Sequence, residues 1–281
     1  MQLNWLFFLD PGTHAAIIIT AAALTLAIAA EMYRPRRELS APLGWRWGNN
    51  LTLAVLTWYV SHVASLAFIL FLARWTQIHQ FGLFHDYQGS LWLPLLVMLL
   101  VTQFISYVTH LLFHHVPWLW AVHAVHHSDV DVDVSTSFRH HPFEPLVFLP
   151  LLTPIVLLLG VPPAAVLGYK IVDIFLTIFS HSNVRLPRGL ESTLSRFIVT
   201  PDFHRVHHSS ESQFTNSNYG NIVPWFDYLF GTARKRDFDS HERFELGLEY
   251  ARDRRSGRLD RLLLAPFSRR STERRAGTQQ N

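Results

Sequence analysis

Long apolar runs constrain the fold of this chain more than any other feature of its sequence. Several of them approach the roughly 20 residues that a helix needs to cross a bilayer, and they lie at about residues 14–30, 51–73, 91–115, 145–161 and 163–180. Because the apolar 49% of the 281 residues is gathered in such runs, bulk solubility is not expected. We therefore predict an all-α integral membrane helical bundle.

The flanks of these runs predict a topology. Positive charge follows the first run instead of preceding it, which is the reverse of a cleaved signal peptide, so this run is expected to remain as a helix. The last two runs, joined at Gly160, are expected to form a short helical hairpin beside about three full spans. The loop 34–46 has four arginines and the loop 74–90 has one, which predicts an outside N-terminus and a cytoplasmic basic side.

Histidine is abundant and cysteine is absent. The lack of cysteine excludes disulfides, thiolate-held iron–sulfur clusters and a cysteine nucleophile, so any metal must be held by nitrogen or oxygen. Most of the 17 histidines lie between His110 and His208. The net charge is +3, and 17 of the 24 Lys and Arg residues follow His181, which favours a membrane-surface face over a nucleic-acid site.

Three short motifs account for most of this clustering: HLLFH at 110–114, HAVHH at 123–127 and HRVHH at 204–208. Residues four apart share one face of a helix, so both imidazoles can reach one metal. Neutral imidazole suits Fe, Zn, Cu and Ni. The eight histidines of the motifs exceed the roughly four ligands of one tetrahedral zinc. We therefore predict a two-metal centre that can activate dioxygen near a hydrophobic chain, with all the histidine groups on the cytoplasmic face.

The stretch 91–232 resembles the fatty acid hydroxylase and sterol desaturase superfamily of membrane di-iron enzymes. Besides the three motifs, FRHHPFE around His141 resembles the RHPLE-like segment of that family, and FSHSNVRLP around His181 resembles its HSN segment. NYGNIVPWFDYLFGT, from Asn218 to Thr232, resembles its closing signature. His181 stands alone where some relatives have a second histidine four residues away.

The resemblance implies two iron ions, O2 as co-substrate, and the hydroxylation or desaturation of a lipid, sterol or similar chain. Electrons are expected from a separate partner of ferredoxin or cytochrome b5 type, because the sequence has no HPGG-type haem segment and no cysteine. The ligands that it implies are His110, His114, His123, His126, His127, His141, His181, His204, His207 and His208.

Other polar residues are expected to have structural roles. His115 and His140, each next to a predicted ligand, are expected to be surface groups. The acidic residues at 129, 131 and 133 are expected in a solvated loop. Asp202 could orient a ligand imidazole, and Asp227 is expected to support the site without binding metal.

Two other classes of protein remain as alternatives. A membrane metal transporter would place its ligands along a path at mid-span, whereas these histidines cluster at one end of the spans. A zinc-dependent hydrolase would need a carboxylate placed as in HExxH, which none of the motifs provides. For the leading interpretation, we expect N-terminal transmembrane helices and loops (1–90), a fatty-acid-hydroxylase-like catalytic domain with the histidine motifs (91–250) and a basic, partly disordered tail (251–281).

Overall fold

The computed structural model describes residues 11–58, 67–253 and 257–267. Over these residues the chain forms twelve α-helices, with short 3-10 helices between some of them and no β-strand. The predicted all-α class is therefore confirmed for the described part of the chain.

The apolar runs become the long helices of the structure. They are α1 (Pro11–Tyr33), α2 (Leu43–Trp58), α3 (Ala67–Ile78), α4 (Trp92–His115), α6 (Glu144–Leu159) and α7 (Pro163–His181). The predicted run 51–73 is shared between α2 and α3, and its middle part lies outside the described residues. Among the described helices, α4 and α7 are long and apolar enough to cross a membrane.

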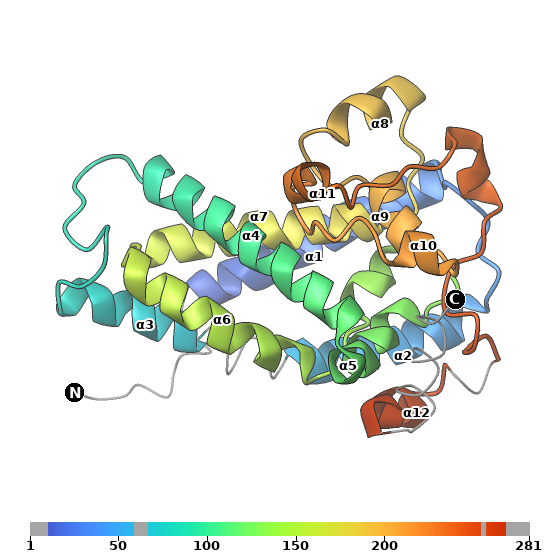
Figure 1. Ribbon diagram of the computed structural model, residues 1–281, viewed down its shortest axis with the longest axis horizontal. Helices are drawn as coiled ribbons and strands as arrows, with labels where there is room; N and C mark the ends of the chain where they lie inside the picture. Colours follow the sequence, from blue (N-terminus) through green and yellow to red (C-terminus); the bar gives the residue numbers. More distant parts are fainter. Residues whose placement is uncertain (1–10, 59–66, 254–256, 268–281) are drawn as a thin grey trace.

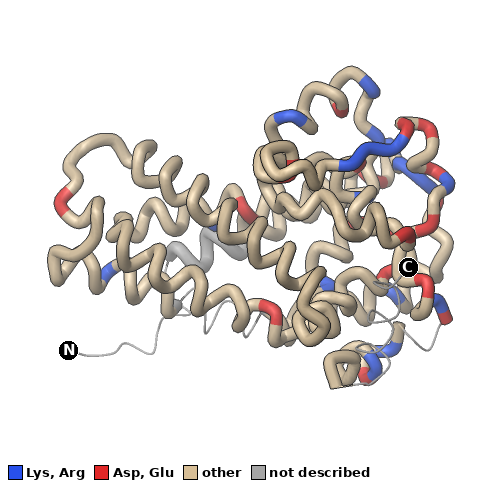
Figure 2. The backbone as a smooth tube through the Cα atoms, viewed as in Figure 1, with Lys and Arg blue, Asp and Glu red and all other residues tan. Residues whose placement is uncertain are grey.

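The long helices pack lengthwise, and the short helices gather at one end (Figure 1). α4 contacts α6 and α7, while α7 also contacts α1 and α3. The core between them is apolar and includes Leu70, Met98, Val156 and Val166. Figure 2 shows that most charged residues lie at the end with the short helices. We call this end the cap; it contains α5 (Pro117–His127), α8 (Arg188–Leu194), α9 (Pro201–His207), α10 (Ser212–Thr215), α11 (Trp225–Phe230) and α12 (Leu259–Leu264).

The turn between α6 and α7 matches the predicted break at Gly160. Gly160 ends α6 in the left-handed conformation, with φ +57°, and a Cβ at this position would lie 2.4 Å from the Phe81 carbonyl oxygen. The two consecutive helices joined at this turn both pack on α3 and α4, and α7, with 19 residues, is longer than the short hairpin that was expected.

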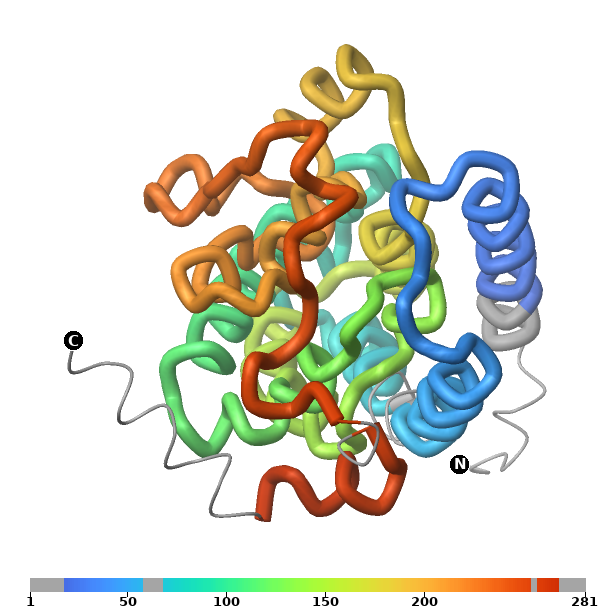
Figure 3. Tube along the Cα trace, turned by 90° about the vertical axis from the view of Figure 1, so that its right-hand side faces the viewer, coloured from blue at the N-terminus to red at the C-terminus, as the bar shows by residue number. Residues whose placement is uncertain are grey.

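A buried ion pair and a hydrogen bond fasten the α1–α2 connection to the cap. Arg36, whose side chain is fully buried, lies 3.0 Å from Asp202 in α9. Arg37 donates to the carbonyl oxygen of Phe244 at 2.9 Å. Figure 3, which faces this end, shows the segment after α1 running beside the chain at about residues 235–250.

The acidic stretch after α5 is not solvated, so that prediction was wrong. Asp129 and Asp133 are buried against Arg46 of α2, and Asp129 lies 3.0 Å from its guanidinium. Asp131 accepts the backbone N–H groups of Ser40 and Ala41 at 2.9 and 2.8 Å. Partners distant in sequence pair with or hydrogen-bond to these carboxylates, which is why the local sequence pattern gave the wrong environment.

Candidate metal centre

Three helices and the end of a fourth bring nine histidines together inside the cap. α4 carries His110 and His114, α5 carries the second motif, α7 ends at His181, and α9 carries most of the third motif. They form two groups, within each of which the candidate ligand atoms lie within 4.8 Å of one another. The first group is His110, His114, His123, His127 and His207, and the second is His126, His181, His204 and His208.

The two HxxHH motifs contribute to the groups in opposite ways. His123 and His127, four residues apart in α5, belong to the first group, while His126 belongs to the second. In the third motif, His204 and His208 belong to the second group, and His207 belongs to the first. Each motif therefore gives a pair to one group and a single imidazole to the other, as expected when i and i+4 share a helix face and i+3 is rotated from it.

Local sequence fixes where these short helices begin. Pro117 is the first residue of α5 and Pro201 is the first residue of α9, where the missing N–H costs nothing and φ is already helical. Thr200 caps α9 by accepting the N–H of Phe203 at 3.3 Å. These start signals place each HxxHH motif on a helical segment.

The contacts of the ring nitrogens in the first group fit a bound cation. His110 Nδ1 lies 2.7 Å from the Tyr219 carbonyl oxygen, and His123 Nδ1 lies 3.0 Å from Glu144 Oε1. Both acceptors require a proton on Nδ1, so in each neutral ring Nε2 carries a lone pair. These two Nε2 atoms are only 3.0 Å apart. Two facing lone pairs repel each other, and a shared metal ion would remove that repulsion.

The second group repeats this arrangement. His181 Nδ1 lies 2.8 Å from the Thr177 carbonyl oxygen, which directs Nε2 inward. That Nε2 is 2.9 Å from His204 Nε2 and 3.2 Å from His126 Nε2.

His207, in the first group, is oriented in the same way. Its Nδ1 donates to the Ser217 carbonyl oxygen at 2.6 Å, and its buried Nε2 has no hydrogen-bond partner among the described residues.

Electrostatics favours the neutral, metal-binding form of these imidazoles. Burial, and then the neighbouring histidines, holds the pKa well below the usual range for five of them. These five are His126, His127, His204, His207 and His208.

A buried carboxylate that was not among the predicted site residues supports the first group. Glu144 lies 3.0 Å from His123 Nδ1 and 3.1 Å from His140 Nδ1. Burial alone would lower the pKa of His140, but Glu144 more than offsets this and the pKa is raised. The His140 ring stacks on His126, with centroids 4.4 Å apart. His140, which was expected at the surface, is only partly exposed. The only sequence signal for Glu144 was the final letter of FRHHPFE.

The other predicted residues lie outside the two groups. His141 Nε2 lies 3.2 Å from the Leu263 carbonyl oxygen, and its Nδ1 accepts the N–H of Phe143 at 3.2 Å. His115 lies 3.3 Å from the Tyr219 hydroxyl.

Of the two aspartates singled out in the sequence, Asp227 supports the site as expected, whereas the expected orienting role of Asp202 was wrong. Asp202 contacts Arg36 and Arg205 and orients none of the nine histidines. Asp227 accepts the N–H groups of Tyr219 and Gly220 at 2.8 and 2.7 Å. It thereby holds the loop whose Tyr219 carbonyl fixes His110.

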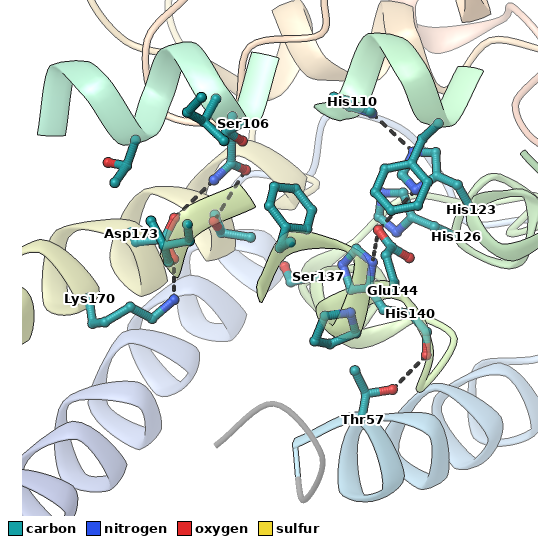
Figure 4. Close-up of a pocket in the computed structure, with 18 of the residues that line it drawn as sticks. Thr57, Ser106, His110, His123, His126, Ser137, His140, Glu144, Lys170 and Asp173 are labelled. Atoms are coloured by element: carbon teal, nitrogen blue, oxygen red, sulfur yellow. Dashed lines mark hydrogen bonds and ion pairs between the residues drawn. The ribbon is translucent and has the colours of Figure 1, made fainter. Parts of the chain in front are cut away.

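A cavity of about 360 Å³ adjoins both histidine groups (Figure 4). Its lining includes His110 and His123 from the first group, and His126 and His181 from the second. The aliphatic and phenylalanine side chains of its wall come from α4 and α6, and Lys170 and Asp173 of α7 also line it. The sequence signal for this pair, two charges within an apolar run, was missed.

The fold and site define a class: an α-helical protein with helices of membrane length and a buried, histidine-rich site. A family model described as fatty acid hydroxylase matches residues 95–232. Over these residues the chain belongs to the fatty acid hydroxylase family, within the superfamily that the motifs resembled. Family membership and the two apolar helices together indicate association with a membrane.

Several curated proteins are similar to part of this chain. The ornithine lipid hydroxylase OlsE of Rhizobium tropici is 36% identical over 135 residues, which cover 48% of this chain and 40% of that protein. A very-long-chain aldehyde decarbonylase of Oryza sativa subsp. japonica is 32% identical over 53% of this chain and 24% of its own length. The human alkylglycerol monooxygenase is 28% identical over 45% and 27%. The chain thus spans less than half the length of these relatives, and no solved structure matches it.

Proposed function

We propose that this chain is an oxygen-dependent, di-iron membrane oxidoreductase that hydroxylates a lipid or another hydrophobic chain. The observation that carries the proposal is the convergence of nine histidines in two adjacent groups beside a largely apolar cavity. The names of two relatives, a lipid hydroxylase and an alkylglycerol monooxygenase, favour hydroxylation. Desaturation is the nearest rival within the same chemistry.

The proposed ligands are the members of the two groups. One iron would be held by the first group and the other by the second, which assigns nine of the ten predicted histidines. His141 is not included, because backbone groups engage both of its ring nitrogens. Imidazole nitrogens suit iron as ligands. At the second group, which has four histidines, an iron ion would have room for further ligands.

Bound iron would supply the activation of dioxygen and the electron transfer that attack on an unactivated C–H bond needs. The chain's own residues orient the centre and the substrate. Glu144 and the carbonyl of Tyr219 hold Nδ1 protons so that Nε2 points inward. Phe148, Leu149 and Leu152 line the cavity and would exclude water from a bound chain. Hydroxylation consumes two electrons and two protons for each O2, with the second oxygen leaving as water, so a separate electron-transfer partner is part of the proposal.

The proposal includes an orientation in the membrane. α4 and α7 both end in the cap, where their last residues are His115 and His181. The cap also carries most of the charge (Figure 2). We place it on the cytoplasmic side, with about three full spans and the α6–α7 pair in the bilayer. The divisions 1–90, 91–250 and 251–281 then separate spanning helices, catalytic domain and tail.

The test compares two variants in lipid-dependent oxygen uptake with a generic reductase system. The double variant His126→Ala/His207→Ala removes one ligand from each group and is expected to abolish uptake and iron binding. His141→Ala, outside both groups, is the matched control and is expected to keep both. Equal loss in both variants, or uptake that survives in the double variant, would contradict the proposed site.

Two further assays separate the alternatives. Iron-independent ester or amide cleavage by a zinc-loaded sample would support the hydrolase. Zinc content alone would not, because zinc outcompetes ferrous iron at nitrogen sites. Metal flux into sealed vesicles without oxygen uptake would support the transporter.

A further inference from the structure

We propose that Lys170 and Asp173 form a subsite for the polar headgroup of the substrate, and that this headgroup carries no net charge. The inference rests on the proposed function, because it concerns the substrate of the same cavity. It names two residues of α7 that belong to neither histidine group.

The pair is part of a small polar network in the cavity wall. Lys170 Nζ lies 2.7 Å from Asp173 Oδ2, and Asn221 donates to Asp173 Oδ1 at 2.9 Å. All three residues line the cavity, and Thr177, also in the wall, donates to Asn221 Oδ1 at 3.5 Å. The side chains of Lys170 and Asp173 keep 32% and 16% of their exposure. In Figure 4 they lie on the opposite side of the cavity from His123 and His126.

Stability alone does not explain the pair. Lys170 and Asp173 are the only Lys, Arg, Asp or Glu residues in α7, which is otherwise apolar enough to cross a membrane. Charges inside such a helix are costly and usually mark a site of function. A paired lysine and aspartate could be replaced by apolar residues at little cost or with a gain in stability.

The geometry sets the distance between the headgroup and the reacting carbon. Asp173 and His181 are eight residues apart in one helix, which is about 12 Å at 1.5 Å per residue. Apolar side chains such as Ile105, Phe148 and Leu149 also line the cavity. A headgroup held at Asp173 would therefore place a carbon on the order of 12 Å along its chain beside the histidines.

The chemistry of the pair selects the kind of headgroup. Lys170 offers N–H donors and Asp173 offers acceptor oxygens, so a group that both accepts and donates can contact both. An anionic carboxylate would bring a second negative charge next to Asp173, and a bare hydrocarbon would leave the exposed faces of the pair without partners. An amide, or a zwitterion with ammonium and carboxylate, meets both requirements without adding net charge.

The test measures binding to the full chain in lipid nanodiscs, with four probes that share one twelve-carbon chain. The probes are dodecanamide, N-dodecylglycine, dodecanoate and dodecane. The key variant is Lys170→Leu/Asp173→Leu, which removes both charges and leaves neither one unpaired. The matched control is Arg258→Leu/Asp260→Leu, which removes an exposed ion pair whose side chains are 55% and 57% exposed. Lys170→Arg keeps the charge and tests for rescue.

We expect the Lys170→Leu/Asp173→Leu variant to bind dodecanamide or N-dodecylglycine at least tenfold more weakly, with dodecane unchanged. The control and Lys170→Arg should bind as the wild type does. Comparison of dodecanamide with N-dodecylglycine shows whether the subsite prefers an amide or a zwitterion. Preference for either one supports the subsite. Unchanged affinity for both, or tightest wild-type binding of dodecanoate, would overturn it.

Iron content, measured on the same samples, separates this inference from the proposed function. An iron-loaded variant with unchanged probe binding would remove the subsite and leave the di-iron proposal standing. If the wild-type protein contains no iron but binds the amide or the zwitterion, and the Lys170→Leu/Asp173→Leu variant binds it more weakly, the subsite is supported and the di-iron proposal is contradicted.

Discussion

Glu144 shows how a single residue outside the ligand set can decide the geometry of the centre. Its carboxylate lies between His123 and His140, and it is buried in the wall of the cavity. A carboxylate that accepts Nδ1–H fixes the tautomer and ring orientation of a ligand imidazole. The sequence predicted the imidazoles from their spacing, but this carboxylate comes from α6, and no local pattern connects α6 to α5.

Replacing Glu144 should therefore weaken metal binding without removing a ligand. Glu144→Ala is expected to lower iron affinity about 10- to 100-fold, because His123 loses the acceptor that orients it. Competition with a graded iron chelator measures this effect. Glu249→Ala, at an exposed acidic position of the cap, is the control. Equal affinity in the two variants would show that Glu144 does not position His123.

At the scale of elements, the turn at Gly160 and the arrangement of the histidine-bearing helices were only partly predictable. Gly160 marked the turn, but the close packing against it also depends on Gly82, whose added Cβ would lie 2.5 Å from the Gly160 nitrogen. The helix starts at Pro117 and Pro201 could be read from the sequence. The way in which each HxxHH motif divides between the two groups could not, because it depends on how α4, α5, α7 and α9 pack.

Gly160→Ala is expected to destabilise the protein by more than about 1 kcal/mol, since a Cβ meets the Phe81 backbone and φ is +57°. Gly189→Ala is the matched control, because nothing lies within 4 Å of its added Cβ. Thermal unfolding in detergent measures both variants. A Gly160→Ala melting temperature equal to that of the control would contradict the close approach.

Glu191 connects α8 to the N-terminus of α9 by accepting the hydroxyl of Thr200. Burial is the main cause that raises its pKa to about 7. Because the folded-state pKa lies above the unfolded value, its contribution is full below about pH 4.5 and is lost as pH rises through about 7. Glu191→Gln keeps an acceptor and removes this titration. The wild type should lose up to about 3 kcal/mol relative to the variant between these values, and parallel melting curves from pH 4.5 to 8 would contradict the prediction.

At the scale of the whole molecule, long apolar helices place a cap rich in charged residues at one end (Figures 1 and 2). The apolar runs predicted these helices, and the motifs predicted that the histidines would meet. The buried acidic residues at 129, 131 and 133 and the charged pair in α7 were not predicted, because their partners are set by tertiary contacts. The orientation in the membrane rests on charge alone.

The absence of cysteine makes this orientation directly measurable. Gln88→Cys, in the loop before α4, should react with a membrane-impermeant maleimide added outside intact cells. Asp239→Cys, at a cap position whose side chain is 75% exposed, should react only after the cells are opened. Labelling of both positions from the same side would reject the proposed topology.

The central claim is that two groups of histidines in one chain hold two iron ions. The most direct measurement is elemental analysis of the wild-type protein, expressed with iron and purified without chelator, with iron counted per chain. The account predicts about two irons per chain, bound by nitrogen and oxygen and by no sulfur in the iron-edge X-ray absorption spectrum. A well-folded protein with one metal ion, or with none, would contradict it.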